Sequence, residues 1–167
     1  MPCSGCGRKN TEPRPDISEW GPLLWKLLHA LSYRTTNDIS QLRLLKIKWK
    51  FLFDTLPLII PCVDCREHVI DYIKTNRIHW QSITSIAQLS EVRDWFFNFH
   101  NAVNARLGKS VFLYEDLIPT YSTIDLRASL TDFSSIMKVF VTTMEIPILS
   151  WNQWKTNILY LFSIYEV

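Results

Sequence analysis

The sequence predicts an all-α protein, a four-helix bundle with a short fifth helix and a C-terminal helical extension. Apolar residues recur at helical spacing along most of the chain, and no strand-like alternation of comparable strength competes with them. Hydrophobic residues make up 47% of the 167 residues, which is enough to bury a sizeable core. We expect three parts: a flexible tail over residues 1–15, a main domain over residues 16–121 and the extension over residues 122–167.

The first helix is expected over about residues 18–34. Asp16 or Ser18 can cap its N-terminus, and Glu19 follows Asp16 at capping-box spacing. Pro22 is tolerated only because it is expected in the first turn, where its missing N–H matters little. A second helix is expected over about residues 39–55, with an apolar stripe formed by Leu42, Leu45, Trp49, Leu52 and Phe53.

The remaining helices are separated by prolines, a glycine and a polar loop. They are expected over about residues 62–76, 92–107, 114–121, 124–146 and 148–165. The helix that ends before Gly108 has the clearest apolar periodicity, whereas the β-branched run over residues 136–143 has the weakest helical character. Pro147 separates the two helices of the extension.

Charge and hydropathy exclude several classes of partner. The net charge of +2 is too small to indicate binding to nucleic acid or to an anionic membrane. No apolar run approaches the ~18 residues of a membrane span, and the polar start of the chain does not resemble a secretory leader. We therefore expect a soluble, cytoplasmic protein with no nucleic-acid partner and no membrane span.

The four cysteines form two Cys-x-x-Cys pairs, Cys3 with Cys6 and Cys62 with Cys65. Without a leader, this usage indicates metal or redox chemistry rather than a structural disulfide framework. Four thiolates can hold zinc in a helical interaction module without catalysis. A thioredoxin-like site needs a sheet that the pattern does not predict. The third hypothesis is a redox disulfide beside an organic cofactor, with no metal.

A helix that begins at Cys62 places both thiols of the second pair in its first turn, where the helix dipole favours a thiolate. Protein side chains cannot pass two electrons on to oxygen, but a flavin can. Aromatic residues make up 13% of the chain and provide material for such a pocket. Polar residues also share faces with apolar ones on two predicted helices. These are Trp25, His29 and Tyr33 on the first, and His100, Val103, Asn104 and Leu107 on the fourth.

Three segments carry a family resemblance. They are Trp20–His29 (WGPLLWKLLH), Pro61–His68 (PCVDCREH) and His100–Lys109 (HNAVNARLGK). They resemble the W-G-x-x-x-W-x-x-x-H, P-C-x-x-C and H-N-x-V-N-x-x-L-x-K segments of the Erv/ALR sulfhydryl oxidases, in the family's order. The resemblance covers roughly residues 18–121.

The resemblance implies a helical bundle, usually a homodimer, that binds FAD noncovalently and oxidises dithiols in proteins. It implies that Cys62 exchanges with the incoming dithiol, that Cys65 lies against the flavin, and that O2 is reduced to H2O2. The FAD-lining positions of the family correspond to Gly21, Trp25, His29, His100, Val103, Asn104, Leu107 and Lys109. His68 and Tyr114 match less closely, and Tyr33 lies at a different offset from the family's aromatic residue.

Cys3 and Cys6 resemble the family's shuttle disulfide, which collects electrons from the substrate, here a protein dithiol or a thioredoxin-like carrier. About ten residues link Cys6 to the first helix, a reach of up to ~33 Å when extended. The chain lacks the additional cysteines that often staple cellular members, so a homodimer would rest on packing alone. A small oxidase with an added helical tail resembles the viral branch, which implies an infected cell's cytoplasm or the virion. The extension is expected to add bundle packing, or to alter the dimer interface or bind a partner.

Overall fold

The computed structural model describes residues 14–165, and within this range it contains seven α-helices and no β-strand. The helices are α1 (Ile17–Ser32), α2 (Leu42–Thr55), α3 (Val63–Thr75), α4 (Ser90–Arg106), α5 (Leu117–Tyr121), α6 (Leu126–Thr142) and α7 (Ile148–Tyr165). Short 3-10 turns occupy Ile39–Gln41, Leu56–Ile59, Ala87–Leu89 and Tyr114–Asp116. The all-α prediction is confirmed, and the β-branched run of the extension is helical as far as Thr142.

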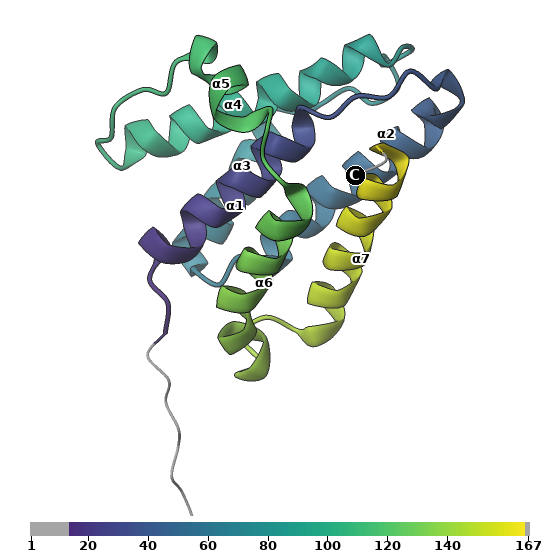
Figure 1. Ribbon diagram of the computed structural model, residues 1–167. Coiled ribbons are helices and arrows are strands. Elements are labelled where there is room, and N and C mark those ends of the chain that lie inside the picture. Colours follow the sequence, from purple (N-terminus) through teal and green to yellow (C-terminus); the bar gives the residue numbers. More distant parts are fainter. Residues whose placement is uncertain (1–13, 166–167) are drawn as a thin grey trace, which may run out of the picture.

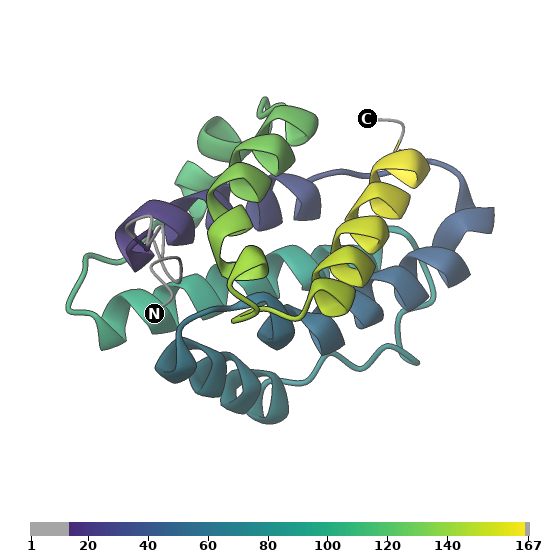
Figure 2. The same ribbon diagram turned by 90° about the horizontal axis from the view of Figure 1, so that it is seen from below.

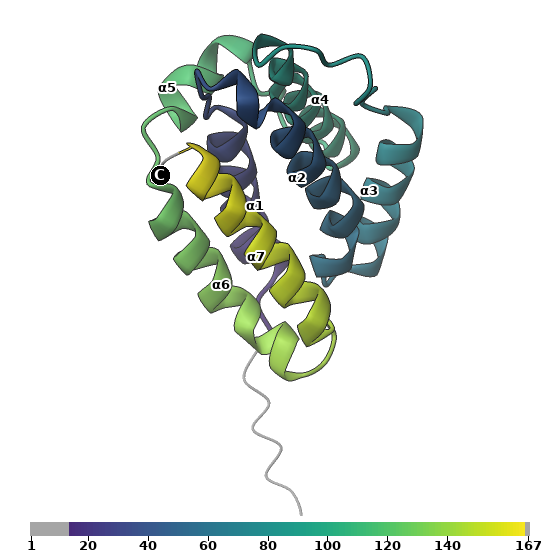
Figure 3. The ribbon, with the colours of Figure 1, turned by 90° about the vertical axis from the view of Figure 1, so that its right-hand side faces the viewer.

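The helices pack around one continuous hydrophobic core. α4 and α6 both pack on α1, and α7 packs on α2. Figure 3 shows α6 and α7 side by side in front of α1 and α2, with α3 and α4 farther back on the other side. α6 and α7 come together at the loop that joins them and diverge away from it (Figures 1 and 2). The extension therefore contributes directly to the core that supports α1 and α2.

The first helix starts at a complete capping box. The Asp16 carboxylate accepts a hydrogen bond from the Ser18 N–H at 2.8 Å, and the Glu19 carboxylate accepts one from the Asp16 N–H at 2.6 Å. Because this cap starts α1 at Ile17, Pro22 is its sixth residue and lies in the second turn, not in the first as expected. The proline therefore removes the N–H that would bond to the Ser18 carbonyl, yet the helix continues through it.

Polar contacts fix the extension to the first two helices. The indole N–H of Trp49 on α2 donates to the Tyr165 hydroxyl at 2.9 Å, and the Asn157 amide donates to the Lys48 carbonyl at 2.9 Å. At the start of the extension, the Arg34 guanidinium donates to the Ser122 and Ile124 carbonyls at 3.2 and 2.6 Å. These bonds set the position of α6 and α7 relative to the α1–α2 pair.

The two fully buried tryptophans of this region are expected to respond differently to truncation. Trp49→Phe leaves the Tyr165 hydroxyl without its donor, whereas Trp154→Phe removes an indole N–H that has no partner. Both changes lose similar ring volume, so Trp49→Phe should lower the free energy of unfolding by about 1–2 kcal/mol more than Trp154→Phe. Denaturant-induced unfolding of the two variants measures this difference. Equal losses would show that the Trp49–Tyr165 bond contributes little.

Candidate active site

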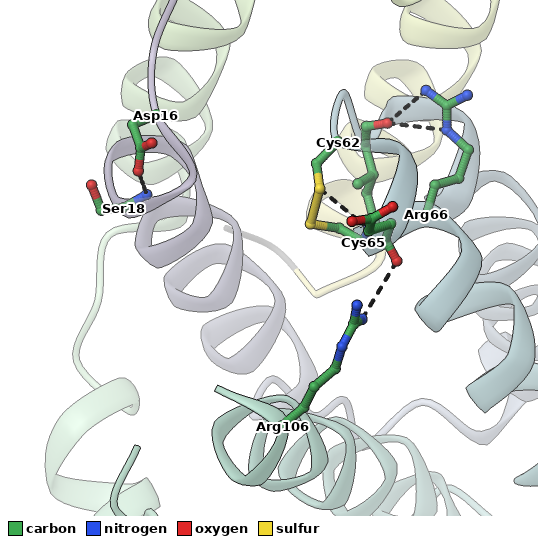
Figure 4. Close-up of a disulfide and its surroundings, with 8 residues drawn as sticks. Asp16, Ser18, Cys62, Cys65, Arg66 and Arg106 are labelled. Atoms are coloured by element: carbon green, nitrogen blue, oxygen red, sulfur yellow. Dashed lines mark hydrogen bonds between the residues drawn. A yellow bond between two sulfur atoms is a disulfide. The ribbon is translucent and has the colours of Figure 1, made fainter. Parts of the chain in front are cut away.

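The Cys-x-x-Cys pair at the start of α3 forms a disulfide, with the two Cα atoms 5.2 Å apart. Cys62 is the N-cap residue of α3, and its sulfur accepts a hydrogen bond from the Cys65 N–H at 3.2 Å. Arg66 holds the turn before the helix, because its guanidinium donates to the Ile60 carbonyl at 2.8 and 3.2 Å (Figure 4). The prediction that the third helix begins near Cys62 is confirmed. Both sulfur atoms belong to partly exposed residues, so an incoming thiol can reach the pair.

The disulfide forms part of the wall of a cavity of about 520 Å³. In Figure 4 the N-terminal turn of α1 and the end of α4 flank α3 around the disulfide. Ten of the sequence-predicted site residues line the cavity: Gly21, Trp25, Cys62, Cys65, His68, His100, Val103, Asn104, Leu107 and Lys109. The fold therefore brings together side chains from the three segments that carry the family resemblance.

Aromatic rings stack along one side of this cavity. Trp25 and His100 are nearly parallel, with ring centroids 4.3 Å apart and planes at 10°, and Phe99 meets the edge of Trp25. Behind them, His29 stacks on Tyr121 at 4.6 Å. Such rings present flat apolar faces to a ligand and carry polar edges that fix its orientation. A planar heteroaromatic ligand matches this wall.

The two histidines are bonded to each other, with 3.0 Å between His29 Nε2 and His100 Nδ1. Burial lowers the pKa of His29 to about 3, with a smaller contribution from His100. Burial lowers the pKa of His100 to about 4, and Lys109 adds to the shift. Both rings are therefore neutral at pH 7. His29 Nδ1 has no partner, which favours the tautomer whose Nε2–H donates to His100, because an unpaired acceptor costs less than an unpaired N–H.

This pair should make the protein less stable in mild acid. The pKa of His29 in the folded state lies below its ordinary value of about 6.5, so the unfolded state binds more protons between the two values. The contribution of neutral His29 to the free energy of unfolding is complete above pH 6.5 and is lost as the pH falls toward 3. At pH 5 the loss from His29 should be roughly 2 kcal/mol relative to pH 7. Denaturant unfolding at the two pH values measures it, and His29→Gln should flatten the dependence. An equally steep dependence in the variant would contradict this assignment.

The C-terminus of α4 is closed by a Schellman motif. Gly108 has φ +65°, its N–H donates to the Ala105 carbonyl at 3.2 Å, and the Lys109 N–H donates to the Asn104 carbonyl at 2.8 Å. Only glycine adopts this conformation without steric cost. The motif turns the chain back so that Leu107 and Lys109 both line the cavity. The next segment is held by the Asn101 side chain, which donates to the Phe112 carbonyl and accepts from the Phe112 N–H.

Three predicted cofactor residues do not line the cavity. His29 is completely buried behind His100. Tyr33 and Tyr114 lie on either side of Arg93, with the guanidinium carbon 5.1 and 5.9 Å from the two ring centroids. The Tyr114 hydroxyl donates to the Asp94 carboxylate at 2.7 Å. These tyrosines therefore anchor the segment after α4 to α1 and α4. Cys3 and Cys6 lie outside the described residues.

The cavity is also lined by residues that were not among the predicted site residues. They are Ile17, Ser18, Trp20, Pro22, Leu24, Leu28, Leu56, Ile60, Asp64, Phe99, Arg106 and Tyr121. Phe99 could have been identified from the sequence as a cavity residue, because it precedes Val103 by four residues and shares its helical face. Tyr121 could not, since its position depends on how α5 folds back over α1.

Cations gather at one end of the cavity. Lys109 and Arg106 line it from the end of α4, and Arg106 reaches the Asp64 carbonyl at 3.5 Å, close to the disulfide (Figure 4). Burial lowers the pKa of His68, and Arg106 adds to this shift. The site thus combines a reducible disulfide, a stacked aromatic wall and two positively charged side chains. It can hold a planar ligand that carries negative charge beside a disulfide.

Two further observations concern metal binding and membrane insertion. Within residues 14–165, no group of three or more His, Cys, Asp or Glu side chains is arranged to hold a metal ion. The four-thiolate zinc hypothesis needs Cys3 and Cys6, which lie outside that range. Among the helices of the described range, none has the length and hydropathy that crossing a membrane requires.

Comparison with known proteins gives one family and several relatives. The model of the Erv1 / Alr family matches residues 22–122. The chain is 36% identical over 96 residues to "Putative FAD-linked sulfhydryl oxidase 096R" of Invertebrate iridescent virus 3, a match that covers 56% of this chain and 60% of that protein. It is 32% identical over 91 residues to "Putative FAD-linked sulfhydryl oxidase 347L" of Invertebrate iridescent virus 6, covering 54% of this chain and 80% of that protein.

A third relative is the "FAD-linked sulfhydryl oxidase" of an African swine fever virus isolate from Kenya. It is 25% identical over 114 residues, covering 65% of this chain and 84% of that protein. No solved structure gives a significant match to the chain. The family match ends at residue 122, so α6 and α7 lie beyond it.

Proposed function

The chain belongs to the Erv1/Alr family, and we propose on that basis that it is an FAD-linked thiol oxidase that forms disulfide bonds in protein substrates. Relatives that bear this activity in their names support the proposal. The observation that carries it is the Cys62–Cys65 disulfide in the wall of a cavity lined by stacked aromatic rings.

The residues present fit the proposed cofactor. The isoalloxazine and adenine rings of FAD are planar, and Trp25, His100 and Tyr121 offer ring faces and edges in the cavity. FAD also carries a diphosphate, which Arg106 and Lys109 can neutralise. His29 Nδ1 is buried without a partner behind the ring wall, and it shows that the polar interior is not fully satisfied by the protein alone. Glycine at position 21 is not required by packing, since an added Cβ would meet only Ile17 at 3.7 Å.

The protein's own part in the reaction is thiol–disulfide exchange. A substrate thiolate attacks the Cys62 sulfur, the Cys62–Cys65 bond breaks, and Cys65 leaves as a thiolate. A second substrate thiolate then attacks the substrate sulfur of the mixed disulfide and releases Cys62. The substrate has lost two electrons and two protons, and the cysteine pair has gained two electrons. Bound FAD supplies the chemistry that accepts two electrons from a dithiol and delivers them to O2, giving H2O2.

Local structure favours this exchange. The released thiolates lie in the first turn of α3, where unpaired N–H groups and the helix dipole stabilise negative charge. Arg106 adds a positive charge near the pair. A stabilised thiolate leaves more readily, so the disulfide is a good oxidant toward substrate thiols.

An absorbance spectrum of the purified protein tests the proposal directly. We expect the visible band of a bound flavin, and oxygen consumption when dithiothreitol is added. Metal analysis of the same sample addresses the competing zinc-stabilised module. About one zinc per chain together with no flavin band would exclude the oxidase function and favour that module.

We also propose that Cys3 and Cys6 act as a shuttle pair that delivers electrons from protein substrates to Cys62. Cys3→Ser should leave dithiothreitol oxidation near the wild-type rate, because a small thiol can reach Cys62 directly. Oxidation of a reduced protein substrate should fall. The two rates are measured as oxygen consumption on the same preparation. If Cys3→Ser impairs both substrates equally, the shuttle role is wrong.

The expected homodimer, a thioredoxin-like carrier and a site of action in an infected cell's cytoplasm or the virion remain part of this proposal. The viral origin of the relatives supports the proposed site of action in an infected cell or a virion. α6 and α7 cover faces of α1 and α2, so a second copy would meet other surfaces of these helices. Sedimentation of the flavin-loaded protein would give its mass and decide the oligomeric state.

A further inference from the structure

A second hollow, of about 460 Å³, lies between α6 and α7 and will be called the α6–α7 groove. One face of each helix lines it. On α6 these are Arg127, Leu130, Thr131, Ser134, Ser135, Lys138, Val141 and Thr142, and on α7 they are Trp151, Lys155, Leu159 and Phe162. The spacing of three and four residues on α6 marks a single helical stripe. The backbones of the two helices diverge away from the loop that joins them (Figures 1 and 3).

The groove is positively charged. Arg127, Lys138 and Lys155 line it, and none of its lining residues is acidic. Across residues 14–165, neither Lys138 nor Lys155 forms an ion pair with an acidic side chain. Lys138 on α6 and Lys155 on α7 therefore bring two cations to the groove from its two sides. Their charge is available to a negatively charged ligand.

The floor of the groove combines apolar and unsatisfied polar surface. The apolar part comes from core residues whose edges reach the groove, Leu130, Trp151 and Phe162. Leu159 also lines the groove and is 41% exposed. The Ser134 hydroxyl is buried and has no hydrogen-bond partner, although the neighbouring Ser135 hydroxyl donates to the Thr131 carbonyl. A hydroxyl in that state gains from a ligand that brings an acceptor. The surface therefore suits a ligand with both apolar and anionic groups.

The length of the stripe selects the kind of ligand. The apolar residues Leu130 and Val141 of the stripe are eleven residues apart on α6, which corresponds to roughly 16 Å along the helix axis. A compact anion such as phosphate cannot cover a stripe of that length, whereas a peptide can. Nucleic acid is also an extended anion, but the apolar side chains between the cations and the small net charge of +2 favour a peptide.

We propose that the α6–α7 groove binds an acidic, amphipathic segment of a partner protein. Carboxylates of the segment would pair with Lys138 and Lys155, and its apolar side chains would cover Leu159 and the edges of Trp151 and Phe162. The site lies beyond residues 22–122, where the family match ends, and it does not depend on the proposed thiol oxidase activity. It gives the helical extension a binding role in addition to its packing role.

Fluorescence anisotropy with a defined probe tests the proposal. The probe is a fluorescein-labelled amphipathic peptide of Glu, Leu and Ala, roughly 16 residues long so that a helix can follow the stripe. We expect saturable binding to the full chain that weakens as salt is added. A matched peptide with Gln in place of Glu should bind roughly tenfold more weakly or worse. The charge reversal Lys138→Glu/Lys155→Glu should weaken binding of the Glu peptide by a similar factor.

Lys50→Glu/Lys74→Glu is the matched control, because both lysines are exposed and neither lines the groove or the active-site cavity. It should bind the Glu peptide like the wild type. Lys138→Gln/Lys155→Gln removes the charges without reversing them and should give an intermediate loss. Thermal unfolding and the visible flavin spectrum report on folding and on the active site separately, and both should be unchanged.

Several results would overturn the proposal. An equal loss of affinity in the control double variant and in the groove variant would show that the peptide responds to the net charge of the protein and not to the groove. Equal binding of the Gln peptide would show that charge does not select the ligand. If the Glu peptide does not bind saturably, the groove is not a binding site for an acidic segment. Tighter binding of a single-stranded oligonucleotide that displaces the peptide would assign the groove to nucleic acid instead.

Discussion

Cys65→Ser is expected to lower the rate of dithiothreitol oxidation by roughly 10³-fold or more, because a serine cannot form a disulfide with Cys62 and no electron pair can be stored in the first turn of α3. The fold should be unaffected. Serine is slightly smaller than cysteine, and residue 65 is only partly buried. The backbone N–H of residue 65 can still donate to the Cys62 sulfur. The expected variant is thus a folded protein that keeps its flavin spectrum and consumes almost no oxygen.

Cys62→Ser is the companion variant, and it should lose activity to a similar extent while retaining the flavin. Wild-type protein and Cys3→Ser serve as active controls in the same oxygen-electrode assay. Substantial dithiothreitol oxidation by Cys65→Ser would show that substrate thiols bypass the Cys62–Cys65 pair. In that case the disulfide would be structural, and the proposed exchange step would have to be abandoned.

Deleting residues 123–167 is expected to prevent stable folding. α6 packs on α1 and α7 packs on α2, and the deletion removes the completely buried Phe133, Trp154 and Phe162 from the core. Truncating even one such aromatic residue to Ala typically costs about 3–5 kcal/mol. Losing all three is comparable to the whole stability of a typical domain, about 5–15 kcal/mol. The truncated chain should be largely insoluble, or lack the cooperative unfolding transition of the full chain.

Phe133→Ala is the graded control for this deletion. It should remain folded and retain flavin, with a free energy of unfolding lower by about 3–5 kcal/mol. Circular dichroism during denaturant unfolding measures both proteins. A truncated chain that unfolds cooperatively at the wild-type midpoint and keeps its flavin would contradict the packing argument. The extension would then be an accessory element.

Helices could be predicted from sequence because each leaves a local trace. The apolar stripe of α2 and the capping residue Asp16 act over a few positions and are readable without tertiary structure. The placement of α6 on α1 and α7 on α2 leaves no such trace. It depends on contacts such as Trp49 with Tyr165, which are separated by more than a hundred residues. The position of Pro22 was misjudged because the start of α1 depends on whether Asp16 or Ser18 caps it.

The candidate site was predictable to the extent that it lies on helical stripes. Trp25 and His100 were found because each belongs to a periodic pattern, and the fold stacks them. Tyr33 follows His29 at helical spacing but is the C-cap residue of α1, where it faces Arg93 rather than the cavity. Tyr121 reaches the cavity only because α5 folds onto α1. Periodicity identifies a face of a helix, but not what that face meets.

The N-cap of α3 has a consequence for energetics. The atom that caps the helix, the Cys62 sulfur, is also the atom that changes bonding in the proposed reaction. A thiolate accepts the Cys65 N–H more strongly than a disulfide sulfur does, so reduction should tighten the first turn of α3. Thermodynamic reciprocity then requires that anything stabilising this turn also favours the reduced pair and makes the disulfide a stronger oxidant. Helix propensity within α3 thereby becomes a means of tuning the reduction potential of the protein.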